Sequence, residues 1–231
     1  MPALRLALFD CDGTLVDSQH AIVSAMNQAW RADGLGAPDE LAVRRLIGLP
    51  LMQAMAQLLP LAGPEQHLRL VLRYKEAFSA QRERGDGPEP LFEGVRAALD
   101  AVEAAGVLMG IATGKSRRGL VATLEHHGLL GRFVTLQTAD LGPGKPHPAM
   151  VHRAMAETGA DPASTLVIGD TTYDMVMARN ARVGAVGVAW GYHDPDELRV
   201  AGAQLVCTAW GEIPAAVASV LAATEELGSK E

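Results

Sequence analysis

The chain alternates short apolar runs with longer segments in which apolar residues recur at helical spacing. The apolar runs are bounded by polar residues or glycine, as buried parallel strands are. We predict strands at Leu4–Phe9, Val107–Ala112, Phe133–Leu136, Leu166–Gly169 and Ala185–Ala189. Helical patterns follow them at Gly94–Ala105, Ser116–His127, Pro148–Thr158, Tyr173–Asn180 and Ile213–Leu227. This alternation predicts βαβ units, and therefore an α/β fold with a Rossmann-like parallel sheet and helices on both faces.

One long segment breaks the alternation. From about Ser18 to Arg84 the pattern is helical throughout, at Ala21–Ala32, Asp39–Ile47, Leu51–Leu59 and Glu65–Arg84. A return rich in proline and glycine, Gly85–Pro90, follows and has the composition of a linker. We therefore predict that residues 17–85 form an inserted α-helical domain over the sheet, and that residues 1–16 and 86–231 form an α/β core domain.

Composition narrows the class of protein. The chain has 231 residues, 48% of them hydrophobic, which is enough for a large core with a smaller satellite domain. The net charge of -7, without a run of lysine and arginine, disfavours nucleic acid as a partner. Cys11 and Cys207 are too few for a disulfide framework. We see no signal peptide and no apolar stretch of membrane-spanning length, so we expect a cytoplasmic protein without membrane contact, either a monomer or a homodimer.

Polar residues that carry chemistry stand where the predicted strands end. In open α/β sheets, ligands bind beyond the carboxyl ends of the strands. The residues at these positions are Asp10 and Asp12 after the first strand, Thr113 and Gly114 after the second, and Asp170 and Asp174 after the fourth, with Lys145 just before a helix. Each residue taken alone also fits a turn former, a helix cap or a solvated loop residue. Four carboxylates converging on one edge would repel one another, and a hard divalent cation with oxygen ligands, Mg²⁺ above all, would neutralise them.

These segments resemble the four signature motifs of the haloacid dehalogenase superfamily, in the family's order and over nearly the whole chain. The motifs are Asp10–Ser18 (DCDGTLVDS), Thr113, Lys145, and Gly169-Asp170-Thr171 through Asp174. The helical insertion after the first motif is similar to that family's small cap domain, which could close over the substrate.

The resemblance implies a role for each residue. Asp10 is the expected nucleophile, which attacks phosphorus and forms an aspartyl phosphate. Asp12 is expected to protonate the leaving alcohol and then to activate water. Mg²⁺ is expected on Asp10, the backbone carbonyl of Asp12 and Asp170, with Asp174 in support. The expected phosphoryl contacts are Gly13, Thr113, Gly114 and Lys145.

Two further segments, Ile47–Pro50 (IGLP) and Ala189–His193 (AWGYH), resemble segments of phosphoglycolate-phosphatase-like members with a small helical cap, to which the chain is most similar within the family. This implies a phosphatase acting on a small phosphorylated metabolite, with phosphoglycolate as the leading substrate. Arg44, Arg45 and Gln53 are candidates to contact a second anionic group, although solvated helix charges fit equally well. One departure is Arg182, which stands where the group usually has glycine.

Single residues distinguish this phosphatase interpretation from other activities. A phosphosugar mutase usually carries histidine where this chain has Ile22, with His20 two residues early, and a pyrophosphatase stays open. A non-catalytic binding or regulatory module would be expected to lack Asp10 or Asp12. A P-loop requires glycine at position 109, which is methionine, so we expect Lys115 to be peripheral or solvated. Carboxylates on both sides of Cys11 argue against a thiol nucleophile and for a small buried side chain.

Overall fold

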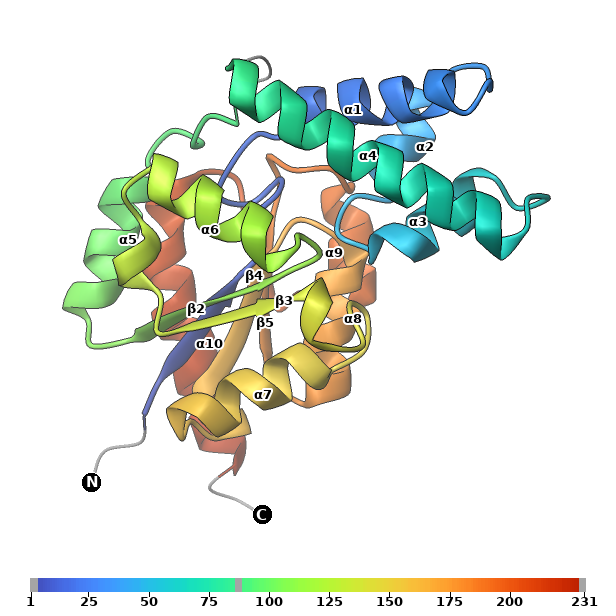
Figure 1. Cartoon of the computed structure of the whole chain (residues 1–231). Helices are drawn as coiled ribbons and strands as arrows, with labels where there is room; N and C mark the ends of the chain where they lie inside the picture. Colours follow the sequence, from blue (N-terminus) through green and yellow to red (C-terminus); the bar gives the residue numbers. More distant parts are fainter. Residues whose placement is uncertain (1–3, 86–88, 229–231) are drawn as a thin grey trace.

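Figure 1 shows the computed structural model of the chain, which describes residues 4–85 and 89–228. Over these residues six strands form one sheet in the order β3-β2-β1-β4-β5-β6, with every neighbouring pair parallel. The strands are β1 (Leu6–Phe9), β2 (Leu108–Thr113), β3 (Thr135–Thr138), β4 (Thr165–Gly169), β5 (Gly184–Val188) and β6 (Leu205–Cys207). The predicted α/β fold is confirmed, while β6 was not predicted.

Helices cover both faces of the sheet, and the side chains of β1 show how. Ala7 and Phe9 face one apolar core, while Leu6 and Leu8 face another, because successive side chains on a strand point to opposite faces. The first core is completed by residues of α5 (Val95–Ala104), α6 (Arg117–His126) and α10 (Ile213–Gly228). The second is completed by residues of α7 (Ala149–Thr158), α8 (Thr172–Ala181) and α9 (Pro195–Ala201). A strand buried on both faces is apolar at every position, which is why β1 reads as an unbroken apolar run.

β1 lies at the centre of the sheet, at the point where the strand order reverses. Phe9 is in register with Ile111 of β2 on one side and with Ile168 of β4 on the other. The amide of the next residue, Asp10, donates to the carbonyl of Ile168 at 2.9 Å. Asp10 therefore stands between the carboxyl ends of β2 and β4, where ligands bind in this class of fold.

Residues 19–84 form four helices, α1 (Gln19–Ala32), α2 (Glu40–Arg45), α3 (Leu51–Leu58) and α4 (Pro64–Arg84). They bury an apolar cluster of their own, which includes Met26, Trp30, Met55 and Leu70. In Figure 1 the long helices α1 and α4, coloured blue and teal, lie across the end of the sheet where β1 stops.

The chain leaves the sheet for these helices and returns along neighbouring paths. Val16 and Leu91 form an isolated antiparallel bridge. The amide of Asp17 donates to the carbonyl of Pro90 at 2.8 Å, and the amide of Phe92 donates to that of Leu15 at 3.1 Å. Residues 86–88 of the predicted linker, with the predicted boundary at residue 86, lie outside the described residues.

Arg182, the departure noted in the sequence, has a backbone that explains why glycine is usual there. It follows the last residue of α8 and adopts left-handed angles, with φ 59° and ψ 39°. A side chain in this conformation brings its Cβ too close to the neighbouring carbonyl, which glycine avoids.

Candidate active site

The residues predicted from the strand ends gather at the carboxyl edge of the sheet. Asp10 follows β1, Thr113 ends β2 and Asp170 follows β4, and all three are buried. Lys145 comes from the loop before α7 and is fully buried, with its ammonium 2.8 Å from Oδ2 of Asp10 and 2.6 Å from Oδ1 of Asp174. Four separate segments of the chain thus meet around Asp10.

The loop after β1 is shaped by Gly13. Its φ is +80°, and a Cβ at this position would collide with the carboxylate of Asp170 and the ring of Tyr192. The amide of Gly13 donates to the carbonyl of Val16 at 2.9 Å, which closes the turn. Glycine at position 13 therefore permits both the left-handed turn and the close approach of the first and fourth motifs.

Burial and like charges shift the proton equilibria of the carboxylates. Burial, with repulsion from Asp174, raises the pKa of Asp10 to about 7, although the ammonium of Lys145 lowers it. Burial also raises the pKa of Asp170, and repulsion from Asp10 and Asp174 adds to this shift. For Lys145, burial opposes the charged form, but Asp10 and Asp174 outweigh it and raise the pKa of the ammonium.

Among the described residues, Asp10, Asp170 and Asp174 can each place one carboxylate oxygen within 4.8 Å of the others. All three carboxylates are buried, and within residues 4–85 and 89–228 the one cation that pairs with the cluster is Lys145. Such a surplus of buried negative charge and hard oxygen donors fits a divalent cation of the Mg²⁺ type.

The carboxylates of this cluster are held by further donors. Asp170 accepts from the hydroxyl of Thr14 at 2.8 Å and from the amide of Tyr192 at 3.0 Å. Asp174 accepts at Oδ2 from the hydroxyl of Thr171 at 2.6 Å, within a capping box that begins α8. Asp174 thus fixes the start of α8 and orients Lys145 at the same time.

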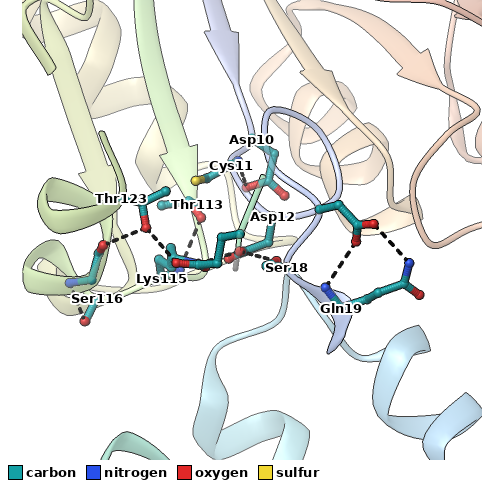
Figure 2. Close-up of polar contacts among 12 residues, drawn as sticks. Asp10, Cys11, Asp12, Ser18, Gln19, Thr113, Lys115, Ser116 and Thr123 are labelled. Carbon is teal, nitrogen blue, oxygen red and sulfur yellow. Dashed lines mark hydrogen bonds and ion pairs between the residues drawn. The ribbon is translucent and has the colours of Figure 1, made fainter. Parts of the chain in front are cut away.

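Asp12 is held by two partners on one oxygen, as Figure 2 shows. Its Oδ1 accepts from the hydroxyl of Ser18 at 2.5 Å and from the ammonium of Lys115 at 2.5 Å. The same ammonium lies 2.6 Å from Oε1 of Glu89. The expectation that Lys115 is peripheral or solvated is therefore wrong, because its side chain is only 8% exposed. The two carboxylates draw it inward, and although burial opposes its charge, they raise its pKa.

Several residues of the site were given no role by the sequence analysis. Ser18 closes the first motif, and Tyr192 follows β5 and places its hydroxyl 3.2 Å from that of Ser18. Glu89 belongs to the predicted linker, where a single acidic residue gives no signal of its own. The contacts of Tyr192 and Glu89 join segments distant in sequence, and Ser18 lies well beyond the end of β1, so the strand-end pattern could not reveal them.

A cavity of about 610 Å³ opens beside Asp10 and Asp12. It is lined on the sheet side also by Thr113, Gly114 and Lys115, and on the other side by residues of α1 to α4. The hydroxyl of Thr113 accepts from the amide of Lys115 at 3.2 Å. The cavity therefore joins two of the predicted phosphoryl-binding residues, Thr113 and Gly114, to the four-helix segment, whereas Gly13 and Lys145 are not among its lining residues.

The candidate anion-contacting residues of the sequence lie elsewhere. Arg45 pairs with Glu197 at 2.9 Å, and Arg44 lies 3.7 Å from Glu40 on its own helix. Of the described residues that line the cavity, none is Arg44, Arg45 or Gln53. Cys11, by contrast, is buried in the core as expected, and burial with the nearby Asp12 raises the pKa of its thiol.

Comparisons with known proteins find relatives over most of the chain. A family model for haloacid dehalogenase-like hydrolases matches residues 7–188. The protein named "Probable phosphatase IndB" of Dickeya dadantii (strain 3937) is 36% identical over 217 residues, which cover 94% of this chain and 94% of that protein. A phosphoglycolate phosphatase of Vibrio vulnificus (strain YJ016) is 29% identical over 84% of this chain and 88% of that protein. The solved structure of a predicted phosphatase from Clostridium acetobutylicum matches the fold with a TM-score of 0.83 at 22% identity, over 94% of this chain and 99% of that one.

The chain belongs to the haloacid dehalogenase-like hydrolase family. Within it, the chain is an enzyme of the phosphatase class, in the phosphoglycolate-phosphatase-like subgroup. Across the helices that the structure describes, none has the length and apolar character needed to cross a bilayer.

Proposed function

We propose that this enzyme hydrolyses a phosphomonoester with the help of Mg²⁺, through an aspartyl phosphate formed on Asp10. The observation that carries the proposal is the position of Asp10, buried at the switch point of the sheet and paired with Lys145 beside Asp170 and Asp174. Phosphoryl transfer requires little of a protein beyond positioning and charge neutralisation, and this arrangement supplies both.

Asp10 attacks phosphorus and displaces the alcohol of the substrate. Lys145 orients the attacking carboxylate from a distance of 2.8 Å and offers positive charge to the phosphoryl oxygens. The hydroxyl of Thr113 and the amides of Gly13 and Gly114 complete the proposed phosphoryl contacts. Asp10, the carbonyl of Asp12 and Asp170, with support from Asp174, would hold Mg²⁺, whose positive charge would keep Asp10 ionised and neutralise the phosphoryl group.

Asp12 transfers protons in both halves of the reaction. It protonates the departing alcohol, and in the second half it takes a proton from the water that attacks the aspartyl phosphate. Ser18 and Lys115 both contact Oδ1 of Asp12, which fixes the carboxylate beside the cavity and leads us to assign proton transfer to Oδ2.

Residues 17–85 act as the cap domain in this proposal, over a core of residues 1–16 and 86–231. The separate apolar cluster of α1 to α4 supports movement of these helices as a unit. The adjacent connections at Val16 and Leu91 support a hinge there. Closure of the cap over the cavity would exclude water from the reacting groups.

The substrate is a small phosphorylated metabolite, and the subgroup makes phosphoglycolate the first compound to test. Cys11 and Cys207 are free and buried, which supports a reducing, cytoplasmic location. The test is hydrolysis of p-nitrophenyl phosphate, phosphoglycolate, sugar phosphates and pyrophosphate, with Mg²⁺ and after treatment with EDTA. Turnover that EDTA abolishes and Mg²⁺ restores supports the proposal. Full turnover in EDTA refutes the metal assignment, and isomerisation of a sugar phosphate without release of phosphate indicates a mutase.

A further inference from the structure

The cavity beside Asp10 continues into the four-helix segment, and its far wall has a marked chemical character. We propose that the preferred substrate is a phosphomonoester whose leaving group is uncharged, mainly apolar and as large as a substituted ring. This inference rests on the proposed function, since it places the phosphoryl group on Asp10 and the rest of the substrate in the cavity. Whatever fills the cavity is therefore bonded to the group being transferred.

Apolar side chains from three elements form this wall. Ile22 and Met26 come from α1, Ile47 from the turn after α2, and Val71 and Phe78 from α4. The first four belong to the buried cluster of the helical segment, so the wall is the inner face of that cluster. A wall of this kind stabilises apolar surface brought from water.

An aromatic pair faces the cavity beside these aliphatic residues. The rings of Tyr74 and Phe78 stack with centroids 5.7 Å apart, and both residues line the cavity. The ammonium of Lys115 lies 5.3 Å from the centroid of Phe78, so the aromatic surface begins next to the proposed acid–base group. Aromatic walls favour planar or ring-bearing groups.

The cations that line the cavity near the reacting groups already have partners. Arg82 donates to Glu89 at 2.7 Å and to the hydroxyl of Thr123 at 3.0 Å. Lys115 is held between Asp12 and Glu89. A second anionic group on the substrate would lose its hydration where it meets the apolar wall. The remaining cationic lining residues in the described chain are Lys75 and Arg118, and both are exposed.

The size of the cavity agrees with its chemistry. Clefts of about 300–1,000 Å³ commonly enclose ligands much larger than a two-carbon acid. At 610 Å³ the cavity is larger than phosphoglycolate requires, and its carboxylate would face apolar side chains. An uncharged ring bonded to the phosphate would instead place apolar surface against these side chains.

The test compares three phosphates of primary alcohols, which have similar intrinsic reactivity. They are ethyl phosphate, 2-phenylethyl phosphate and 2-(4-carboxyphenyl)ethyl phosphate, assayed with Mg²⁺ beside p-nitrophenyl phosphate and phosphoglycolate. A single methylene in an apolar pocket changes kcat/KM by roughly 10–200-fold, so a whole ring should raise it at least about tenfold over ethyl phosphate. The added carboxylate should reverse most of that gain.

Two variants place the effect in the cavity. Met52→Lys adds a cation to a lining residue that is 43% exposed, whereas Leu61→Lys adds the same charge to a fully exposed residue outside the lining set. Met52→Lys should shift the preference toward the carboxyphenyl compound by about tenfold or more, the lower end of the range expected for a pocket contact. Leu61→Lys should leave the ratio unchanged, and far-UV circular dichroism verifies folding of both.

The outcomes separate this inference from the proposed function. Turnover of p-nitrophenyl phosphate with equal kcat/KM for the three alkyl phosphates, or a preference for the carboxylate compounds, overturns the inference and leaves the phosphatase mechanism standing. Absence of Mg²⁺-dependent turnover for every compound overturns both. A ring preference that Met52→Lys and Leu61→Lys change equally also overturns it, because the preference would then not arise in this cavity.

Discussion

The ammonium of Lys115 lies 2.5 Å from Oδ1 of Asp12, within a buried network that also includes Glu89. Lys115 follows β2, Asp12 follows β1 and Glu89 lies on the return from the helical segment. The proposed acid–base residue is therefore positioned jointly by the sheet edge and by the connection to the helical segment. Movement of the helices would therefore change the position of the Asp12 carboxylate, which transfers the proton in the proposed mechanism.

Replacing Lys115 with methionine tests this positioning. We expect kcat/KM for an alkyl phosphate to fall about tenfold or more, which is part of the roughly 10²–10⁴ that a general acid–base group contributes. The loss for p-nitrophenyl phosphate should be smaller, because its leaving group departs without protonation. The measurement is the ratio of the two kcat/KM values in the variant and in the wild type.

Asp12→Asn is the benchmark for that ratio, since it removes the proton transfer itself. Lys115→Met and Asp12→Asn should favour p-nitrophenyl phosphate in the same direction. An equal loss of kcat/KM for both substrates in Lys115→Met would mean that Lys115 acts on phosphoryl binding and not through Asp12.

Arg182 offers a prediction about stability away from the site. A non-glycine residue in this left-handed conformation destabilises the fold by about 1–2 kcal/mol. Glycine avoids this strain, but it loses more conformational freedom on folding, which offsets part of the gain. Arg182→Gly should therefore raise the free energy of unfolding by about 0.5–1 kcal/mol, with kcat unchanged. Urea denaturation measures it.

Arg182→Ala is the matched control, because it also removes the guanidinium but keeps a Cβ in the same conformation. The glycine variant should be more stable than the alanine variant. Equal stability of the two would show that the backbone conformation is not the cause.

We expect Asp33, in the helical segment, to make a pH-dependent contribution to the free energy of unfolding. Its carboxylate accepts from Gln66 at 2.9 Å and pairs with Arg69 and Arg73, each at 3.4 Å. The hydrogen bond from Gln66 and the pairing with Arg69 lower its pKa, although burial opposes this. A lowered folded-state pKa stabilises the protein above the ordinary value of about 3.9, and the effect disappears as the pH falls through the folded value.

Asp33→Asn should accordingly reduce the free energy of unfolding by about 1 kcal/mol at pH 7, and the difference should shrink below about pH 4. Denaturant titrations at both pH values check it. Asp196→Asn, at a surface ion pair with Arg199, should stay within about 0.5 kcal/mol of wild type. A difference for Asp33→Asn that grows in acid would contradict this account.

Much of the fold was predictable because buried parallel strands appear in the sequence as unbroken apolar runs. β1, β2 and β4 are apolar runs that end at chemistry-bearing residues, and their register brings those residues together. β6 was missed because it has three residues, and Leu205 within it is 40% exposed, so it lacks the long buried run. The helix α9 was missed for a related reason. It is seven residues long and buries only Leu198, so it has no helical repeat of buried apolar residues.

The residues of the site that directly follow a strand could be predicted from the sequence. The side-chain contacts between distant segments could not. Asp10 and Asp170 follow directly from strands, and the structure brings both to one edge. The direction of the Lys115 side chain depends on Asp12 and Glu89, which lie 103 and 26 residues away. Such pairings arise from tertiary packing, which local patterns do not encode.

The central claim, transfer of phosphate to Asp10, is tested most directly by chemical trapping. Asp12→Asn is mixed with p-nitrophenyl phosphate and Mg²⁺, quenched in acid and reduced with borohydride, which converts an aspartyl phosphate to homoserine. Peptide mass spectrometry then locates the modified residue. We predict homoserine at position 10, more of it in Asp12→Asn than in wild type, and none in an Asp10→Asn protein that stays folded. Homoserine at another aspartate, or turnover by Asp10→Asn near the wild-type rate, would contradict the claim.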